Sequence, residues 1–402
     1  MRCKLGDISE ITKLAGYEFT KYIKYIPDGE IIAVRALNLK NGALVLDDIQ
    51  RISKEVSETL PRSQLHKNDI VLSYTGTLGE CAQIREDGKY HLAPNVCKIT
   101  PNDSVVNPNF LFQYIRCEKF KQTLINYAHG STQPTIPMST IRDIPVDIPD
   151  DLEKQGKIAA ILSILDEKIA INRAINDNLE ATIQAAFDKA FHDAGVSLPE
   201  TIIKQNKVPQ GWTDATVGDF ASVQTGPFGS QLHNEDYVES GTPIITVEHM
   251  DGKYIAHRNL PLVSQNDVDR LRKYDLHTGD IVFSRVGSVD RAVMVSQHED
   301  GWLFSGRCLR VRPYDPNTGS YFLWWFNQPV IRQLVTASAV GATMPSINTS
   351  ILNSIRIVFP QKDIVTQFCK MADGLIEIIA TNLEEIRKLN DAREYIQLSL
   401  SR

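Results

Sequence analysis

The chain of 402 residues lacks the features that mark membrane, secreted and disulfide-stapled proteins. No apolar run approaches the roughly 18 residues that a membrane-spanning helix needs, so we expect no membrane span and no membrane partner. No charged and apolar leader opens the chain, which argues against a cleaved secretory signal. The six cysteines are scattered without a CxxC pair, and are therefore interpreted as small core residues of a reduced, cytoplasmic protein. The net charge of −6 excludes a strongly basic coat for nucleic acid.

Catalytic patterns are also missing. GxSxG, HExxH, Walker and GxGxxG motifs do not occur. Residues 107–110 (Asn-Pro-Asn-Phe) are similar to the tetrad with which amino-methyltransferases hold a base, but the second proline is absent and the string is interpreted as a helix start. Asp150 with Asp166 and Lys168 mimics a nuclease metal site, yet the last two are expected to be solvated positions beside a heptad seam. We therefore predict no catalytic residue, no metal ligand and no cofactor bound by this chain.

What the sequence does contain is an internal repeat with a period of about 211 residues. Three blocks return in the same order: Leu5–Ile8 as Val217–Phe220, Asp69–Gly76 as Asp280–Gly287, and Gly130–Ile136 as Gly341–Ile347. The chain is therefore expected to carry two similar domains.

Each repeat begins with short β-type runs and turn residues, with one helix starting near Asn107 or near Ser320. A long helix follows in each repeat. The predicted fold class is α+β, with two tandem mixed α/β domains, each followed by a long helix. The expected segments are a first domain at 1–150, a helix at 151–195, a linker at 196–211, a second domain at 212–361 and a helix at 362–402.

Both long helices have apolar residues in an unbroken 4-3 rhythm, which is typical of a coiled-coil seam. The rhythm favours packing of the helices on each other, with separate packing on their own domains as the alternative. The predicted seam consists of Leu162, Leu165, Ile169, Asn172, Leu179, Ile183, Leu375, Ile379, Asn382, Ile386, Leu389 and Ile396.

Polar residues differ between the repeats at matched loop positions, while the surrounding strand residues agree. This pattern is typical of two recognition domains that share one backbone scaffold and bind different targets. The residue types at these positions are suited to contacts with base edges and phosphates. Ordinary loop divergence is the alternative. The candidate DNA contacts are Tyr74, Thr75, Thr77, Ser131, Thr132 and Gln133 in the first half and Arg285, Ser288, Thr343 and Met344 in the second, with the local basic residues Lys21, Lys24, Arg291, Arg307 and Arg310. Arg310 and Arg312 are expected to share one face of a strand.

Several strings together resemble the specificity subunit of type I restriction–modification systems. They are Val208–Trp212, Val217–Asp219, Thr225–Ser230, Leu165–Asn172 and the two Gly-x-Thr-x-Pro-x-Ile segments. The first half departs from the pattern, since it lacks the Pro-x-Gly-Trp lead-in and the Gly-Pro-Phe-Gly-Ser string. The resemblance adds Ser230 and Gln231 to the candidate DNA contacts.

The resemblance implies two target-recognition domains, each reading one half of a bipartite site in double-stranded DNA. It also implies two antiparallel spacer helices in a circular, pseudo-twofold arrangement, two methyltransferase subunits and a restriction/translocase subunit. The specificity subunit has no catalytic site of its own, and the methyltransferase partner is expected to use S-adenosylmethionine. Two other classes stay open, namely a protein-binding scaffold with twin domains and a single-chain methyltransferase or nuclease.

Two further expectations follow. Residues 1–149 carry 18 basic and 17 acidic side chains and residues 212–360 carry 12 and 15, so the chain alone should bind DNA weakly and depend on its partners.

Asn172 and Asn382 occupy equivalent seam positions. If the pseudo-twofold axis passes near their level, we predict that their amides hydrogen-bond to each other and fix the register, so that replacing both by leucine raises the melting temperature while loosening the preferred gap between half-sites.

Overall fold

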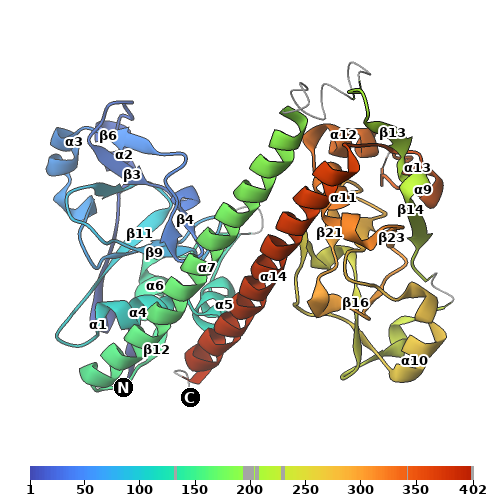
Figure 1. Ribbon diagram of the computed structural model, residues 1–402. Helices are drawn as coiled ribbons and strands as arrows, with labels where there is room; N and C mark the ends of the chain where they lie inside the picture. The colour runs from blue at the N-terminus through green and yellow to red at the C-terminus, as the bar shows by residue number, and fades with distance from the viewer. Residues whose placement is uncertain (131–133, 193–202, 204–207, 228–230, 342, 400–402) are drawn as a thin grey trace. The chain divides into compact units, whose positions relative to one another are not determined.

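The computed structural model describes residues 1–130, 134–192, 203, 208–227, 231–341 and 343–399 (Figure 1). It divides into two compact units. Unit 1 comprises residues 1–169 together with 388–402, and unit 2 comprises residues 170–387. The end of the chain therefore packs into the unit that the beginning of the chain forms.

Unit 1 contains two four-stranded sheets and a set of short helices. The antiparallel first sheet has the order β2 (Ser9–Lys13), β11 (Val96–Pro101), β8 (Ile70–Ser73) and β9 (Cys81–Gln83). The second sheet has the order β6 (Gln50–Ile52), β3 (Ile31–Val34), β10 (Tyr90–Leu92) and β7 (Gln64–Leu65), and only β3 and β10 are parallel. Two small pairs are β1 (Arg2–Lys4) with β12 (Pro145–Asp147) and β4 (Leu39–Lys40) with β5 (Ala43–Leu44). The helices are α1 (Leu5–Ile8), α2 (Gly16–Tyr22), α3 (Lys54–Thr59), α4 (Pro108–Ile115), α5 (Glu118–Asn126) and α6 (Met138–Asp143).

Unit 2 repeats this plan. Its antiparallel first sheet has the order β14 (Ala221–Thr225), β23 (Cys308–Pro313), β20 (Ile281–Ser284) and β21 (Ala292–Met294). Its second sheet has the order β15 (Tyr237–Val238), β19 (Leu262–Val263), β16 (Thr242–Ile245) and β22 (Leu303–Phe304), with β16 and β22 parallel. The pairs are β13 (Thr213–Thr216) with β24 (Arg356–Phe359) and β17 (Met250–Asp251) with β18 (Tyr254–Ile255). The helices are α9 (Val217–Phe220), α10 (Gln265–Arg270), α11 (Gly319–Phe326), α12 (Pro329–Ala337) and α13 (Thr349–Asn353).

The repeat in the sequence is thus a repeat in the fold. Asn107 caps α4, since its side chain accepts hydrogen bonds from the backbone N–H groups of Asn109 and Phe110, as the interpretation of this string as a helix start predicted. The predicted α+β class, with two tandem mixed domains and two long helices, is confirmed.

Each first sheet is covered on both faces. In unit 2, Phe283 and Leu309 face a core that α11 shares, whereas Val282 and Cys308 face the second sheet. In unit 1, Ile70, Leu72, Cys97 and Ile99 pack with α4, and Val71, Ala82 and Val96 pack with the second sheet. Near-continuous burial along these strands follows from this layering.

The long helices are α7 (Leu152–His192) and α14 (Lys362–Ser399) (Figure 1). Within unit 2 they run antiparallel, since Asn172 contacts Glu385 and Asn176 contacts Asn382, whereas the Phe187 ring lies 5.5 Å from the Phe368 ring. All twelve predicted seam residues are buried or half-buried. The helices therefore pack on each other, as the heptad rhythm favoured.

The predicted bond between Asn172 and Asn382 is wrong. The Asn172 amide donates to Glu385 Oε2 at 2.7 Å, and the Asn382 amide donates to Asn176 Oδ1 at 2.8 Å. The register of the two helices places each amide opposite a different residue, so the buried polar contacts form two separate pairs.

Asp166 also differs from its prediction as a solvated position. Its carboxylate is 24% exposed and forms ion pairs with Arg116 and with Arg393, the latter at 3.0 Å. Gln113 donates a further hydrogen bond of 2.8 Å. The carboxylate thus joins α4, α7 and the end of α14 within unit 1, which is a structural role.

Candidate nucleic-acid interface

Several loops meet at one end of the first sheet of unit 1. β8 ends there at Ser73 and β11 begins opposite it at Val96. The loop after β8 bonds to the segment around residue 135, because Gly76 N–H donates to Pro134 O at 3.0 Å and Ile136 N–H donates to Tyr74 O at 3.0 Å. We call this region, residues 74–79, 93–95, 129–130 and 134–136, the loop end of unit 1.

Unit 2 has the same arrangement at the matching positions of the second repeat. Gly287 N–H donates to Pro345 O at 2.9 Å and Ile347 N–H donates to Arg285 O at 2.9 Å. The bridges His129–Thr135 and Val340–Ser346 are equivalent in the same way. The loop end of unit 2 comprises residues 285–290, 305–307, 340–341 and 343–347. The two loop segments that the sequence analysis selected in each half are therefore brought together in space.

The glycines of these loops are required by the backbone. Gly76 and Gly287 have φ of 79° and 78°, and Gly130 and Gly341 have φ of 96° and 102°. Only glycine adopts such values readily. Gly226, which follows β14, is held by a close approach, since a Cβ there would lie 2.2 Å from Ser305 O.

The predicted residues of unit 1 have different surroundings. Tyr74 is buried with 9% exposure, and Lys13 Nζ lies 5.4 Å from the centre of its ring. Thr75 is half-buried and Thr77 is exposed. Lys21, on α2, and Lys24 are exposed outside the loop end. Ser131, Thr132 and Gln133 lie outside the described residues.

In unit 2 the structure places Arg285, Ser288, Arg307, Thr343 and Met344 at the loop end. Arg285 is half-buried and donates to Gly306 O at 3.1 Å. Ser288, Arg307 and Thr343 are exposed, and Met344 is 66% exposed. Guanidinium, hydroxyl and thioether groups on one exposed surface are suited to phosphates, base edges and the thymine methyl group.

Three further residues predicted for unit 2 are less favourably placed or are not described. Arg291 is exposed after this loop and donates to Val247 O at 3.4 Å. Gln231 accepts a hydrogen bond of 2.6 Å from the Tyr274 hydroxyl, which commits its amide oxygen inside the unit. Ser230 lies outside the described residues.

Arg310 does not belong to this surface, which corrects the sequence analysis. Its side chain is buried, with the residue 6% exposed, and donates to Asp275 O at 2.6 Å and to the side chain of Gln224. Burial lowers the pKa of this guanidinium, with neighbouring Arg312 as the next cause. Arg310 and Arg312 do share a face of β23, but that face packs on the second sheet.

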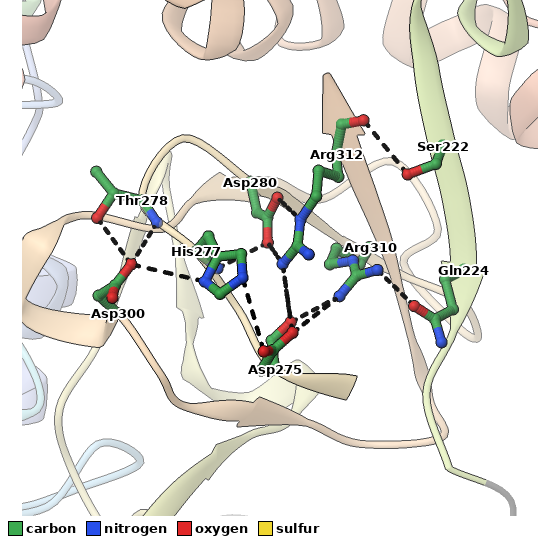
Figure 2. A network of polar contacts seen from close by, with 9 residues as sticks. All are labelled: Ser222, Gln224, Asp275, His277, Thr278, Asp280, Asp300, Arg310 and Arg312. Atoms are coloured by element: carbon green, nitrogen blue, oxygen red, sulfur yellow. Dashed lines mark hydrogen bonds and ion pairs between the residues drawn. The ribbon is translucent and has the colours of Figure 1, made fainter. Parts of the chain in front are cut away.

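Figure 2 shows the polar network that holds these arginines. Arg312 binds both carboxylate oxygens of Asp280, at 2.8 and 2.7 Å, and donates to Asp275 O at 3.0 Å. Burial by itself would lower the pKa of the Arg312 guanidinium, but the hydrogen bonds to Asp280 outweigh this effect, so the pKa is raised. In unit 1, Lys98 takes the place of Arg310 on the equivalent strand and donates to Gln64 O at 3.0 Å. A cationic side chain at this strand position is therefore common to both units and does not distinguish one unit from the other.

Sequence reasoning missed one residue of the unit 1 loop end, Asn95, and one beside it, Lys13 at the end of β2. Lys13 lies over Tyr74, and Asn95 immediately precedes β11. Asn95 is exposed, and its carbonyl accepts a hydrogen bond of 3.2 Å from Tyr74 N–H. The repeat itself carried the signal, because Asn95 and Arg307 both stand immediately before the equivalent strands β11 and β23.

The described ranges contain no group of three or more His, Cys, Asp or Glu that could hold a metal ion. No helix among them combines the length and apolar character that crossing a bilayer requires. Burial raises the pKa of the thiols of Cys81, Cys97 and Cys308 to about 12, so these cysteines are poor nucleophiles.

Comparisons with known proteins agree with the repeat. A family model described as the type I restriction modification DNA specificity domain matches residues 1–181 and again residues 209–388. The chain is 23% identical over 301 residues to the type I restriction enzyme MjaIX specificity subunit of Methanocaldococcus jannaschii, covering 74% of this chain and 68% of that protein. It is 24% identical over 376 residues to the HindI specificity subunit of Haemophilus influenzae, covering 76% of this chain and 79% of that protein.

A solved structure extends the likeness to the fold. The S subunit of a type I restriction–modification system from M. genitalium has a TM-score of 0.64 at 14% sequence identity, covering 100% of this chain and 96% of that one. The resemblance inferred from the sequence is confirmed. The chain belongs to the type I restriction–modification DNA specificity family and carries the family domain twice.

Proposed function

We propose that this chain is the sequence-recognition subunit of a type I restriction–modification complex, in which each unit reads one half of a bipartite site in double-stranded DNA. The observation that carries the proposal is the pair of loop ends. Their backbone hydrogen bonds recur from one repeat to the next, whereas their side chains differ, as with Tyr74 and Arg285 or Thr77 and Ser288. Two loop ends with the same backbone structure and different side chains are suited to the recognition of two different DNA sequences.

The chain itself supplies no catalytic group in this proposal. Methyltransferase subunits bind to it and use S-adenosylmethionine, and a restriction/translocase subunit completes the complex in the cytoplasm. Exposed isoleucines on α7 support docking of a partner on the helices. They are Ile161 (51% exposed) and Ile164 (64%) in unit 1 and Ile171 (55%) and Ile175 (41%) in unit 2.

The net charge of −6 supports a further part of the proposal. Neutralisation of phosphates provides most of the non-specific affinity for DNA, so an acidic chain needs basic partner subunits for tight binding. The long helices then set the number of base pairs between the two half-sites.

Reconstitution with the cognate methyltransferase subunit tests the proposal. Sequencing of methylated positions should reveal one bipartite motif, and exchange of residues 212–360 for the equivalent domain of a relative should change one half of it. A protein scaffold predicts that the complex selects no DNA motif. A single-chain enzyme predicts methylation or cleavage by the purified chain alone. Either result, or a change of both half-sites in the exchange, contradicts the proposal.

A further inference from the structure

The residue that precedes β11 in unit 1 and the residue that precedes β23 in unit 2 occupy the same place in the fold. Tyr74 N–H donates to Asn95 O at 3.2 Å, and Arg285 N–H donates to Arg307 O at 2.8 Å. Val96 then pairs with Ser73 and Cys308 with Ser284. Asn95 and Arg307 are therefore held by the sheet beside the loop that follows β8 or β20.

Both side chains are exposed, and in the described part of the chain neither forms a hydrogen bond, an ion pair or a ring contact. This separates Arg307 from Arg310 and Arg312 on the strand that follows it, whose guanidinium groups bind Asp275 and Asp280. An arginine beside a strand end whose side chain has no polar partner among the described residues is available for a ligand.

The backbone explains only part of this choice of residues. Asn95 has a φ of 71°, a value that asparagine tolerates better than most residues. Glycine would satisfy the same backbone, so the amide group is not required by the turn. Arg307 is not among the described residues with positive φ, and its side chain forms no hydrogen bond, ion pair or ring contact inside the described part of unit 2.

We propose that these two positions read bases, Arg307 a guanine in the half-site of unit 2 and Asn95 an adenine in the half-site of unit 1. An arginine fork donates two hydrogen bonds to the O6 and N7 atoms of guanine, whereas an asparagine amide accepts a hydrogen bond from N6 of adenine and donates one to N7. Arg285, which is bonded to Gly306 O, fixes the turn that carries Arg307. This inference rests on the proposed function.

The test uses the complex reconstituted with its methyltransferase subunit and a DNA library randomised in both half-sites. Arg307→Ala and Arg307→Lys should each reduce the preference for guanine at one position by roughly 5- to 150-fold, since lysine keeps the charge but not the fork. Asn95→Gly should reduce the preference for adenine at one position of the other half-site to the same extent. Arg272→Ala is the matched control, because Arg272 is an exposed arginine of the same unit that lies outside the loop end, in the short helix Arg272–Tyr274 that precedes β20 in the chain. This variant should leave the preferred bases of both half-sites unchanged.

The outcomes separate this inference from the proposed function. If the wild-type complex selects no bipartite motif, the proposed function fails. If it selects one but the Arg307 and Asn95 variants select the same motif, the inference is overturned and the proposed function stands. Uniform weakening of all sequences by Arg307→Ala, restored by Arg307→Lys, would identify a phosphate contact and also overturn the inference.

Discussion

The hydrogen bond between Asn176 and Asn382, on the two long helices of unit 2, allows a sharp test of the structure. Asn176 is 8% exposed, and its Oδ1 accepts a hydrogen bond of 2.8 Å from the Asn382 amide. Among the described residues the Asn176 amide nitrogen has no partner. Replacing Asn382 alone by leucine therefore leaves a buried amide without any hydrogen bond.

The expected magnitude follows from that geometry. An unsatisfied buried polar group costs about 1–3 kcal/mol, and the added apolar surface of a half-buried leucine returns about 1 kcal/mol. Asn382→Leu should therefore destabilise unit 2 by up to about 2 kcal/mol, or a fall in melting temperature of up to about 8 °C. The double variant Asn176→Leu/Asn382→Leu removes both polar groups and should be at least as stable as the wild type.

A double-mutant cycle measures this coupling directly. Urea unfolding of the wild type, the two single variants and the double variant should give a favourable coupling energy of about 1–3 kcal/mol. The variant Asn172→Leu/Asn382→Leu is the contrast, because it removes the Asn172–Glu385 hydrogen bond and leaves the buried Asn176 amide without its bond to Asn382, and it should melt below the wild type. Coupling near zero, or a higher melting temperature for the contrast variant, would refute the assigned register.

Three further predictions rest on other contacts. Burial lowers the pKa of His91 in the folded state. The contribution of its neutral ring to the free energy of unfolding is therefore complete above the unfolded-state pKa of about 6.5, and is lost as the pH falls through the lowered native pKa. His91→Gln should flatten the dependence of the unfolding free energy on pH between about 7.5 and 5.5 by the uptake of about one proton, and an unchanged slope would contradict this. Gly226→Ala should destabilise unit 2 because its Cβ would lie 2.2 Å from a backbone oxygen, whereas Gly374→Ala, on an open position of α14, should stabilise it by about 0.5–1 kcal/mol; thermal melting distinguishes them, and equal shifts would count against the loop geometry. Arg312→Met should cost about 3 kcal/mol, since it removes the ion-pair partner of the 2% exposed Asp280 carboxylate and leaves it the His277 N–H as a donor, and urea unfolding close to that of the wild type would show that the pair is dispensable.

Much of the architecture could be predicted from the sequence. The division into two repeats and the helix starts near Asn107 and Ser320 agree with the structure. The seam between α7 and α14 could also be predicted from the sequence, because the spacing of apolar residues along a helix follows from the local geometry of its backbone. The loops of the candidate interface could be selected in the same way, by comparing one repeat with the other.

Other features were decided by which elements pack together. Alternation along β23 predicts that Arg310 and Arg312 share a face, but it does not say that a second sheet covers that face and removes Arg310 from the DNA-binding candidates. The pattern of the seam selects Asn172 and Asn382, but the axial register between helices assigns each amide its partner. Local periodicity follows from the backbone of one segment, whereas burial and hydrogen-bond partners depend on distances between segments far apart in the chain, and only the tertiary structure fixes those distances.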